Sequence, residues 1–299
     1  MSSPAFVDVQ GRRVRVRVAG PLECPPVVLI HGIGRTLDDW AEQFPRLSSR
    51  CRLIALDLPG CGFSQRAPQP TTLTVLAQAV VDVLNELSEA RPVHLVGNSL
   101  GGAVAMQVAV TEPSRVTSLT LVDSAGFGKE VALALRLLAV PLIGEALTAR
   151  LPRWFARVSE STLFVDPRLA TEARVDHALA VSRQPATGSV MLEIARSLAT
   201  LSGVSAAWRT DLLRTAADLE LPTLLVWGDR DRVLPHTHLQ SARAAFPKAE
   251  SELFPGVGHM PQIEAPDAFA ERFLDFLGGV PQPTGSGAVR SPSVRRQAE

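Results

Sequence analysis

The sequence predicts an α/β fold built on a mostly parallel, eight-stranded sheet with helices on both faces. Three observations predict it. Short, nearly continuous apolar segments recur along the chain, as in parallel strands that are covered on both faces. Helix-like segments alternate with them, which is typical of a sheet layered between helices. Between residues 124 and about 220 this alternation stops and the sequence becomes helical, which indicates an insertion.

The predicted strands differ in character along the chain. A hairpin comes first: residues 5–9 and 13–18 flank Gly11, and strict Val/Arg alternation in the second segment indicates one buried and one solvated face. Apolar, β-branched strands follow at 27–30, 52–56, 93–96, 117–122 and 223–227, and a last strand is expected at 249–254. The helices between them are expected at about 38–47, 72–90, 100–111, 237–246 and 266–277.

The interruption of the pattern divides the chain. We expect residues 1–123 and 221–278 to form the α/β core and residues 124–220 to form a helical cap. The segment 131–143 is apolar on nearly every side, so part of it is expected to line an apolar pocket under the cap. Residues 279–299 are rich in Pro, Gly, Ser, Gln and Arg, which predicts a disordered tail.

Residues 97–102 read G-N-S-L-G-G and place Ser99 between a predicted strand and a predicted helix. A strand, a sharp turn and a helix are the context in which a G-x-S-x-G serine becomes a nucleophile. Small neighbours are needed because the central residue adopts a strained backbone conformation. Ser99 is therefore the candidate nucleophile.

A serine hydroxyl needs a base, and the base needs a partner that fixes its tautomer. His259 lies in a Gly/Pro-rich loop directly after the last strand and is the candidate base. Asp231 follows the strand 223–227 and is the first candidate acid, with Asp229 and Asp123 as rivals. The chain order Ser99, Asp231, His259 is one of the known triad orders.

An oxyanion site is expected beside the serine. His31-Gly32-Ile33-Gly34 directly follows a core strand, so the backbone N–H of Ile33 can point toward Ser99. The N–H of Leu100, at the start of the next helix, is the expected second donor. Such donors stabilise the negative oxygen of a tetrahedral intermediate.

Together these motifs resemble the α/β-hydrolase fold family of serine hydrolases, and they occur in order between residues 27 and 277. The matching segments are 31–34, 57–64 (D-x-P-G-x-G-x-S), 97–102, 227–231 and 258–261. The resemblance implies an esterase- or lipase-like hydrolase with the triad Ser99, Asp231 and His259. The Asn98-containing elbow also resembles that of meta-cleavage-product hydrolases, which break carbon–carbon bonds in aromatic ring-fission products.

Composition excludes several other classes. The chain has 299 residues, 30 basic and 30 acidic, and no net charge, so neither nucleic acid nor an anionic membrane surface is an expected partner. Its 3 cysteines are scattered, which argues against a disulfide framework or a metal site. We expect no cofactor, no membrane span and a cytoplasmic location. The oligomeric state stays open.

The sequence thus predicts cleavage of a carboxylic ester with a hydrophobic acyl or aryl portion. Carbon–carbon hydrolysis is the alternative, although Met260 stands where that group often has tryptophan and no cap arginine can be assigned to a substrate carboxylate. The arginines available for that role are Arg153, Arg157, Arg174 and Arg183. A cofactor-free haloperoxidase-like activity would use the same residues, and a non-catalytic small-molecule binding protein is the alternative of another class.

Overall fold

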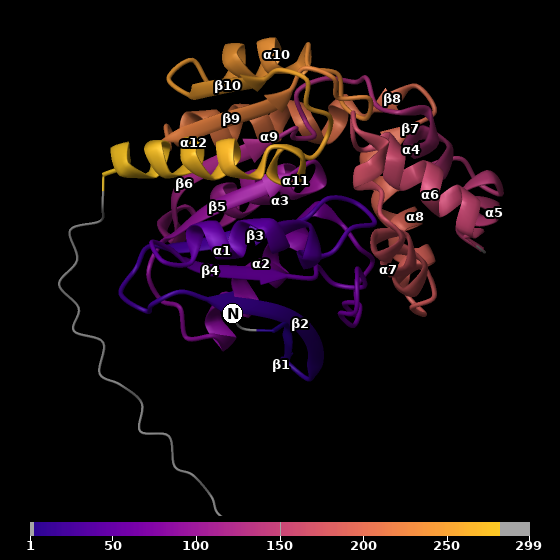
Figure 1. The fold of residues 1–299 in the computed structure, drawn as a ribbon, viewed down its shortest axis with the longest axis horizontal. Helices are drawn as coiled ribbons and strands as arrows, with labels where there is room; N and C mark the ends of the chain where they lie inside the picture. Colours follow the sequence, from indigo (N-terminus) through magenta and orange to yellow (C-terminus); the bar gives the residue numbers. More distant parts are fainter. Residues whose placement is uncertain (1–2, 150, 282–299) are drawn as a thin grey trace, which may run out of the picture.

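In the computed structural model, which describes residues 3–149 and 151–281, eight strands form one sheet (Figure 1). In chain order these are β1 (Ala5–Val9), β2 (Arg12–Ala19), β3 (Pro26–Ile30), β4 (Arg52–Leu56), β5 (Val93–Asn98), β6 (Val116–Val122), β9 (Thr223–Gly228) and β10 (Glu250–Phe254). Their order in the sheet is β1-β2-β4-β3-β5-β6-β9-β10. β2 pairs antiparallel with β1 and β4, and the remaining pairs are parallel. The predicted mostly parallel, eight-stranded sheet is confirmed.

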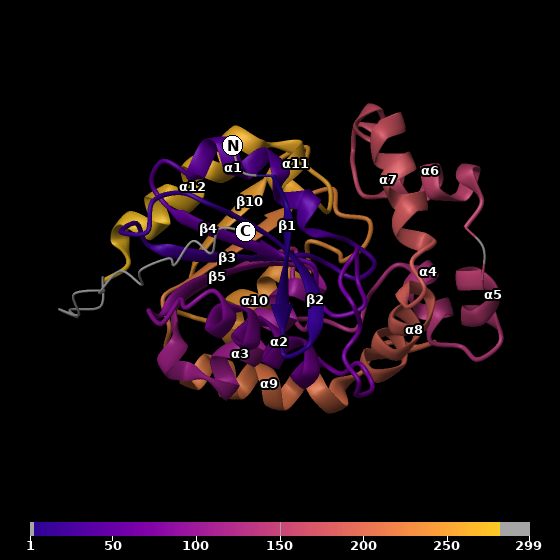
Figure 2. The same cartoon turned by 90° about the horizontal axis from the view of Figure 1, so that it is seen from below.

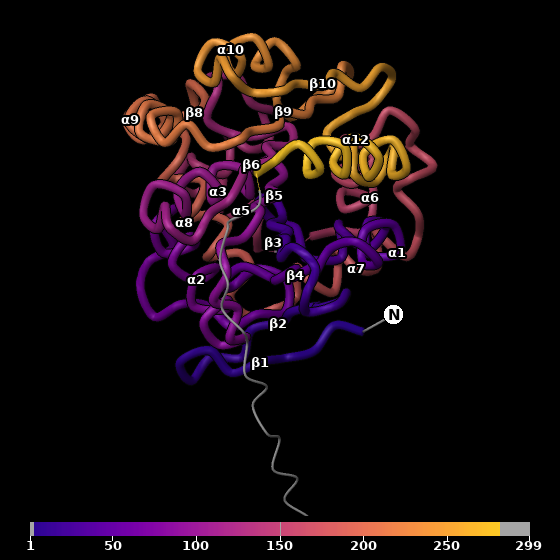
Figure 3. Tube along the Cα trace, turned by 90° about the vertical axis from the view of Figure 1, so that its left-hand side faces the viewer, coloured from indigo at the N-terminus to yellow at the C-terminus, as the bar shows by residue number. Residues whose placement is uncertain are grey.

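Helices cover both faces of this sheet (Figures 2 and 3). One face carries α2 (Leu73–Glu86), α3 (Leu100–Thr111), α9 (Ala206–Asp218) and α10 (His238–Ala245). The other carries the 3-10 helix η1 (Leu37–Gln43), α1 (Phe44–Leu47), α11 (Pro261–Glu264) and α12 (Pro266–Gly279). The short 3-10 helix η2 (Pro113–Arg115) joins α3 to β6. Within the described residues, no helix has the length and apolar character needed to span a bilayer.

The segment between β6 and β9 builds a separate helical layer beyond one end of the sheet (Figure 2). It contains α4 (Leu133–Leu138), α5 (Ile143–Ala149), α6 (Arg153–Thr162), η3 (Pro167–Leu169), α7 (Glu172–Ser182), α8 (Thr187–Leu198) and a small hairpin of β7 (Ala199–Thr200) and β8 (Gly203–Val204). The next helix, α9, packs on α3 in the core instead. We therefore propose that the cap consists of the helices up to α8 and the small hairpin.

The folded core also extends further toward the C-terminus than the sequence predicts. α12 extends to Gly279, and the side chain of Val280 is buried in the core cluster beneath it. The predicted tail, residues 279–299, therefore begins with residues that belong to the folded core. Its residues 282–299 lie outside the described residues.

The main chain of helix α3 lies in close contact with the main chain of the sheet, and three glycines make this possible. A Cβ at Gly97 would lie 2.1 Å from the Gly101 carbonyl oxygen, and one at Gly101 would lie 2.2 Å from the Ile30 carbonyl oxygen. A Cβ at Gly102 would lie 2.1 Å from Ser124 Oγ. Because two of these neighbours are main chain, only glycine fits at Gly97 and Gly101.

A buried group of four charges fixes the cap to the core. Arg35, after β3, donates to Asp39 at 2.8 and 2.7 Å and also bonds to Glu160 of α6. Arg174 of α7 donates to Asp39 at 2.9 Å and to Glu160 at 3.3 Å. Two cations and two anions thus neutralise one another across the cap–core boundary. Burial alone would raise the pKa of Asp39, but the charges and hydrogen bonds of Arg35 and the charge of Arg174 lower it to about 2.

This network predicts how Asp39→Asn changes acid stability. The folded-state pKa is lowered from 3.8 to about 2, so ionised Asp39 contributes about 2 kcal/mol above pH 4 and loses this as the pH falls toward 2. We expect Asp39→Asn to lower the free energy of unfolding at pH 7 by about 3 kcal/mol, because it also leaves the two arginine charges facing the single carboxylate of Glu160. Urea unfolding at pH 7 and pH 3 measures the effect.

The difference between the native protein and Asp39→Asn should shrink by about 1 kcal/mol at pH 3, where half of the linkage term has been lost. Asp166→Asn is the matched control: its ion pair with Arg168 is exposed to solvent, so no measurable change in the free energy of unfolding is expected. An equal gap at both pH values would contradict the assignment of Asp39 as an ionised anchor.

The close approach of α3 gives a second prediction. Gly101→Ala, although it raises helix propensity, should cost at least about 3 kcal/mol because the new Cβ meets the β3 main chain. Gly278→Ala in α12 is the control, since nothing lies within 4 Å of a Cβ there. Thermal unfolding should show a large drop in Tm for the first variant and none for the second. Equal Tm values would show that the helix can move away from the sheet at little cost.

Candidate active site

Ser99 occupies the sharp turn between β5 and α3. Its φ of +57° and ψ of −118° lie outside the regions that a side-chain-bearing residue ordinarily adopts. The turn is fixed on both sides: Ser99 N donates to the Val122 carbonyl at 2.9 Å, and the Ser99 carbonyl accepts from Gly102 and Ala125 at 3.0 Å. The strained conformation is therefore held by the surrounding main chain, as the sequence motif predicts.

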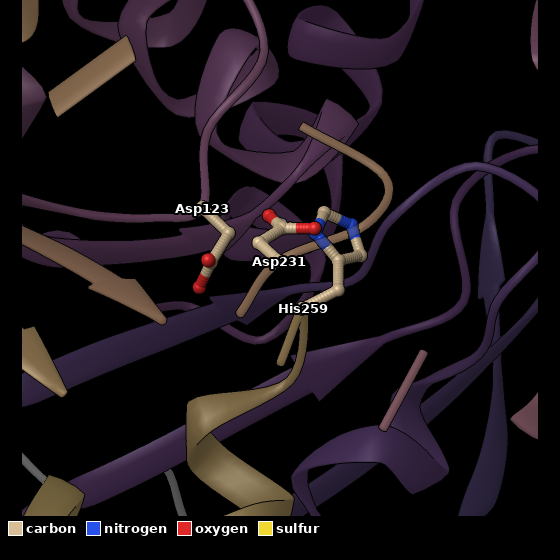
Figure 4. A group of neighbouring side chains, drawn as sticks. All are labelled: Asp123, Asp231 and His259. Carbon is tan, nitrogen blue, oxygen red and sulfur yellow. Dashed lines mark hydrogen bonds and ion pairs between the residues drawn. The ribbon is translucent and has the colours of Figure 1, made fainter. Parts of the chain in front are cut away.

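Asp231 and His259 are joined by a hydrogen bond (Figure 4). His259 Nδ1 and Asp231 Oδ2 lie 2.8 Å apart, and Asp231 Oδ1 accepts from the Val233 and Leu234 N–H groups at 2.7 and 3.0 Å. The carboxylate is thus held at both oxygens, and it fixes the imidazole tautomer with the proton on Nδ1. Nε2 is left as the basic nitrogen. Both partners are buried.

Ser99 and His259 line the same cavity. Among the hydrogen bonds of the described residues, none joins Ser99 Oγ to the imidazole. Such contacts are commonly long before a substrate is bound. The structure therefore joins two of the three candidate residues directly and brings the third to the same cavity wall.

Asp123, a rival acid in the sequence, lies beside Asp231 at the end of β6 (Figure 4). One of its oxygens accepts from Gly228 N at 3.0 Å, and polar atoms of Asp123, Asp231 and His259 all lie within 4.8 Å of one another. Burial, followed by the negative charge of Asp231, raises the pKa of Asp123 well above its usual value. Asp123 is therefore less suited than Asp231 to carry the negative charge that balances a charged imidazole.

The other rival, Asp229, directly follows β9 and accepts at 2.7 Å from the N–H of Gly256, in the loop after β10. The cluster of Asp123, Asp231 and His259 also has donor atoms of the kind that bind metals. Both Asp231 oxygens are engaged and His259 Nδ1 needs its proton for the bond to Asp231. These residues suit proton transfer better than metal coordination.

The loop after β3 lies directly over the serine. A Cβ at Gly32 would be 3.2 Å from Ser99 Cβ. Leu100 is the first residue of α3, where a backbone N–H has no partner within the helix. His31 Nδ1 donates to the Gly32 carbonyl at 2.8 Å and its Nε2 accepts from Leu58 N at 3.0 Å, so the neutral ring shapes the loop. Burial lowers the pKa of His31, which agrees with that neutral state.

Three residues, Asn98, Leu163 and Glu264, hold the loop that carries His259, and the sequence did not predict these contacts. Asn98 Nδ2 donates to the His259 carbonyl at 3.1 Å, and His259 N donates to the carbonyl of Leu163 in the cap at 2.9 Å. Glu264 accepts from Gly258 N at 2.6 Å and from Val165 N at 2.5 Å. Apart from Glu264 and Gly258, these partners are 96 to 161 residues apart in sequence, so local sequence patterns carry no signal for their contacts.

The shared cavity has a volume of about 340 Å³ and is mostly apolar. Cap side chains that line it include Leu135, Leu138, Leu151, Phe155, Val181 and Met191. Among its described lining residues, the ionisable side chains are Arg35, Glu160 and His259. Arg35 is already paired with Asp39 and Glu160, so it offers no free positive charge to a ligand.

The four cap arginines that the sequence offers as carboxylate ligands do not line this cavity. Arg153 pairs with Glu172 and Asp176, and Arg157 also pairs with Glu172. Arg174 belongs to the buried charge network, and Arg183 lies at the end of α7. An anionic substrate group therefore finds no unpaired arginine among the described residues of the cavity wall.

Comparison with known proteins agrees with this geometry. The model of the alpha/beta hydrolase fold family matches residues 25–266. The chain is 34% identical over 283 residues to the dihydrolipoyllysine-residue acetyltransferase component of the acetoin cleaving system of Pseudomonas putida, covering 92% of this chain and 69% of that one.

Two further relatives are named for hydrolysis. Lipase 1 of Psychrobacter immobilis is 29% identical, covering 84% of this chain and 76% of the lipase. The 2-hydroxy-6-oxononadienedioate/2-hydroxy-6-oxononatrienedioate hydrolase of Comamonas testosteroni is 28% identical, covering 89% and 91%. With the sheet order, the serine turn and the family match in agreement, the chain belongs to the α/β hydrolase fold family.

Proposed function

We propose that the protein is a serine hydrolase that cleaves a carboxylic ester with a hydrophobic acyl or aryl portion. The observation that carries the proposal is the tautomer-fixing bond from His259 to Asp231 beside an apolar cavity that also contains Ser99. The family match supports a hydrolase, and the lipase relative supports ester chemistry. The substrate is a small hydrophobic molecule, and no cofactor is required.

The first half of the reaction forms an acyl-enzyme. Ser99 Oγ attacks the ester carbonyl carbon while His259 Nε2 takes the hydroxyl proton. The N–H groups of Ile33 and Leu100 donate to the oxyanion, and Asp231 balances the charge of the imidazolium. The bond from carbon to the alcohol oxygen then breaks, and His259 gives its proton to the leaving alcohol.

The second half returns the enzyme to its starting state. A water molecule attacks the acyl carbon and His259 takes one of its protons. The bond from carbon to Ser99 Oγ breaks, the acid leaves, and the proton on His259 returns to Ser99. Both halves need a neutral imidazole with a free Nε2, which the Asp231 bond provides.

Carbon–carbon hydrolysis is the second candidate. Asn98 in the elbow and the Comamonas testosteroni relative favour it. The charge of the cavity disfavours it, because a ring-fission product carries a carboxylate and the Arg35 guanidinium is neutralised by two carboxylates. We therefore rank ester cleavage first.

A binding protein on the same fold is the candidate of another class. Strain at Ser99 costs folding free energy on the order of 1–3 kcal/mol, and recognition alone gives no reason to maintain it. Labelling by a fluorophosphonate probe separates the two classes. A hydrolase is labelled in the native protein and not in Ser99→Ala, whereas a pure binder is labelled in neither.

The two neighbouring acids predict opposite mutational effects. Asp231→Asn should lower kcat for p-nitrophenyl acetate by about 10⁴-fold, because the amide removes the balancing charge and favours the wrong tautomer. Asp123→Asn should change kcat by less than about tenfold, since burial and the charge of Asp231 raise the pKa of this carboxyl and disfavour the charge that the amide removes. Steady-state rates of both variants, with Ser99→Ala as the blank, make the comparison. The reverse ranking would reassign the acid to Asp123.

A direct substrate competition tests the reaction class. We expect kcat/KM for p-nitrophenyl esters to exceed that for a vinylogous 1,5-diketone ring-fission product by at least about 10²-fold, because the cavity lacks a free cation for the diketone's carboxylate. Absorbance assays of both substrates, corrected with Ser99→Ala, measure the ratio. Preference for the diketone would make the protein a carbon–carbon hydrolase.

A further inference from the structure

A second, smaller cavity meets the large one at the serine. Its volume is about 60 Å³, less than a fifth of the 340 Å³ of its neighbour. Ile33, Ser99 and Leu135 line both cavities, so the two join where the nucleophile and the oxyanion loop lie. A substrate bound at Ser99 therefore has two different spaces for the two sides of its carbonyl group.

The small cavity is apolar and lies between the cap and the core. Leu198 of α8, Ala199 of β7 and Trp208 of α9 form one side, and Leu100 and Leu234 line it from the core. Trp208 is held in place because its Nε1 donates to the Leu198 carbonyl at 2.8 Å. Apart from Ser99, no polar side chain in the described part of the chain reaches its wall except the indole of Trp208, whose N–H is already bonded.

The two cavities differ in their access to the general acid, His259. His259 lines the large cavity and is not part of the small one. The general acid must lie within hydrogen-bond reach of the leaving oxygen, so the alcohol side of the ester points into the cavity that contains His259. The acyl side then points into the cavity that contains Leu100, whose N–H is the expected oxyanion donor.

We propose that the small cavity is the acyl site and the large cavity the alcohol site, so that the preferred substrates are short-chain acyl esters of bulky, lipophilic alcohols or phenols. This inference rests on the proposed ester hydrolysis. The 60 Å³ of the small cavity suits a short acyl chain, such as acetyl to butyryl, whereas the 340 Å³ of the large cavity suits a bulky alcohol or phenol. Water for the second half-reaction reaches the acyl-enzyme through the space that the alcohol leaves.

Two ester series test the assignment. In the acyl series, p-nitrophenyl acetate, butyrate, hexanoate and octanoate share one leaving group. In the alcohol series, phenyl, 2-naphthyl and 4-biphenylyl acetate share one acyl group and have leaving groups of similar acidity. We expect kcat/KM to fall at least about tenfold from butyrate to octanoate and to rise from phenyl to 2-naphthyl acetate.

Matched variants connect each trend to its cavity. Leu198→Ala enlarges only the small cavity and should raise the hexanoate-to-acetate ratio of kcat/KM by about tenfold, with the alcohol series unchanged. Ala199→Leu fills the same space and should confine activity to acetate. If one of these two variants fails to fold, the other still tests the assignment of the small cavity. Phe155→Ala, in the large cavity only, should weaken the preference for 2-naphthyl acetate and leave the butyrate-to-octanoate ratio of kcat/KM in the acyl series unchanged.

The outcomes separate this inference from the proposed function. An optimum at hexanoate or longer, with no gain from phenyl to 2-naphthyl acetate, would place the acyl chain in the large cavity and overturn the assignment while ester hydrolysis stands. Shifts of the alcohol series by Leu198→Ala would also overturn it. Absence of Ser99-dependent hydrolysis in both series would overturn the proposed function, and the inference with it.

Discussion

The whole site depends on the backbone contact between α3 and the strands β3 and β5. Because Gly97 and Gly101 have no side chains, the helix begins directly above the sheet and its first N–H points at the serine turn. The same contact sets the loop after β3 against Ser99. A helix lying a few ångströms further out would move the nucleophile away from both the loop and the histidine. Close packing of main chain is thus the basis of the chemistry.

Two adjacent buried carboxyl groups have different tasks because their surroundings differ. Asp231 accepts from two backbone N–H groups and from the imidazole, whereas Asp123 accepts from one N–H and faces a negative neighbour. Like charges at this distance cannot both persist in a buried place. The negative charge of this pair is therefore favoured on Asp231, the side that holds His259, and Asp123 lies behind it.

The sequence predicted what local patterns encode. Strands with continuous apolar residues, the glycines around Ser99 and the residues after each strand identify the sheet and the cluster at its end. It did not predict contacts made between distant segments, such as the bond from Arg35 to Glu160 or from His259 to Leu163. It also assigned α9 to the cap, since a helix that packs on the core has the same amphipathic pattern as one that packs on a cap. The choice between Asp231 and Asp123 needed three-dimensional positions.

The hydrogen bond from His259 N to the Leu163 carbonyl has a consequence for how the cavity opens. The cap segment that contains Leu163 and Val165 forms one unit with the histidine loop, because Glu264 binds both. If this segment swung away as a rigid body, the loop that carries the imidazole would lose its anchors. An opening of the cap on its other side, where α4 and α5 pack on α8, would leave these anchors of the imidazole in place.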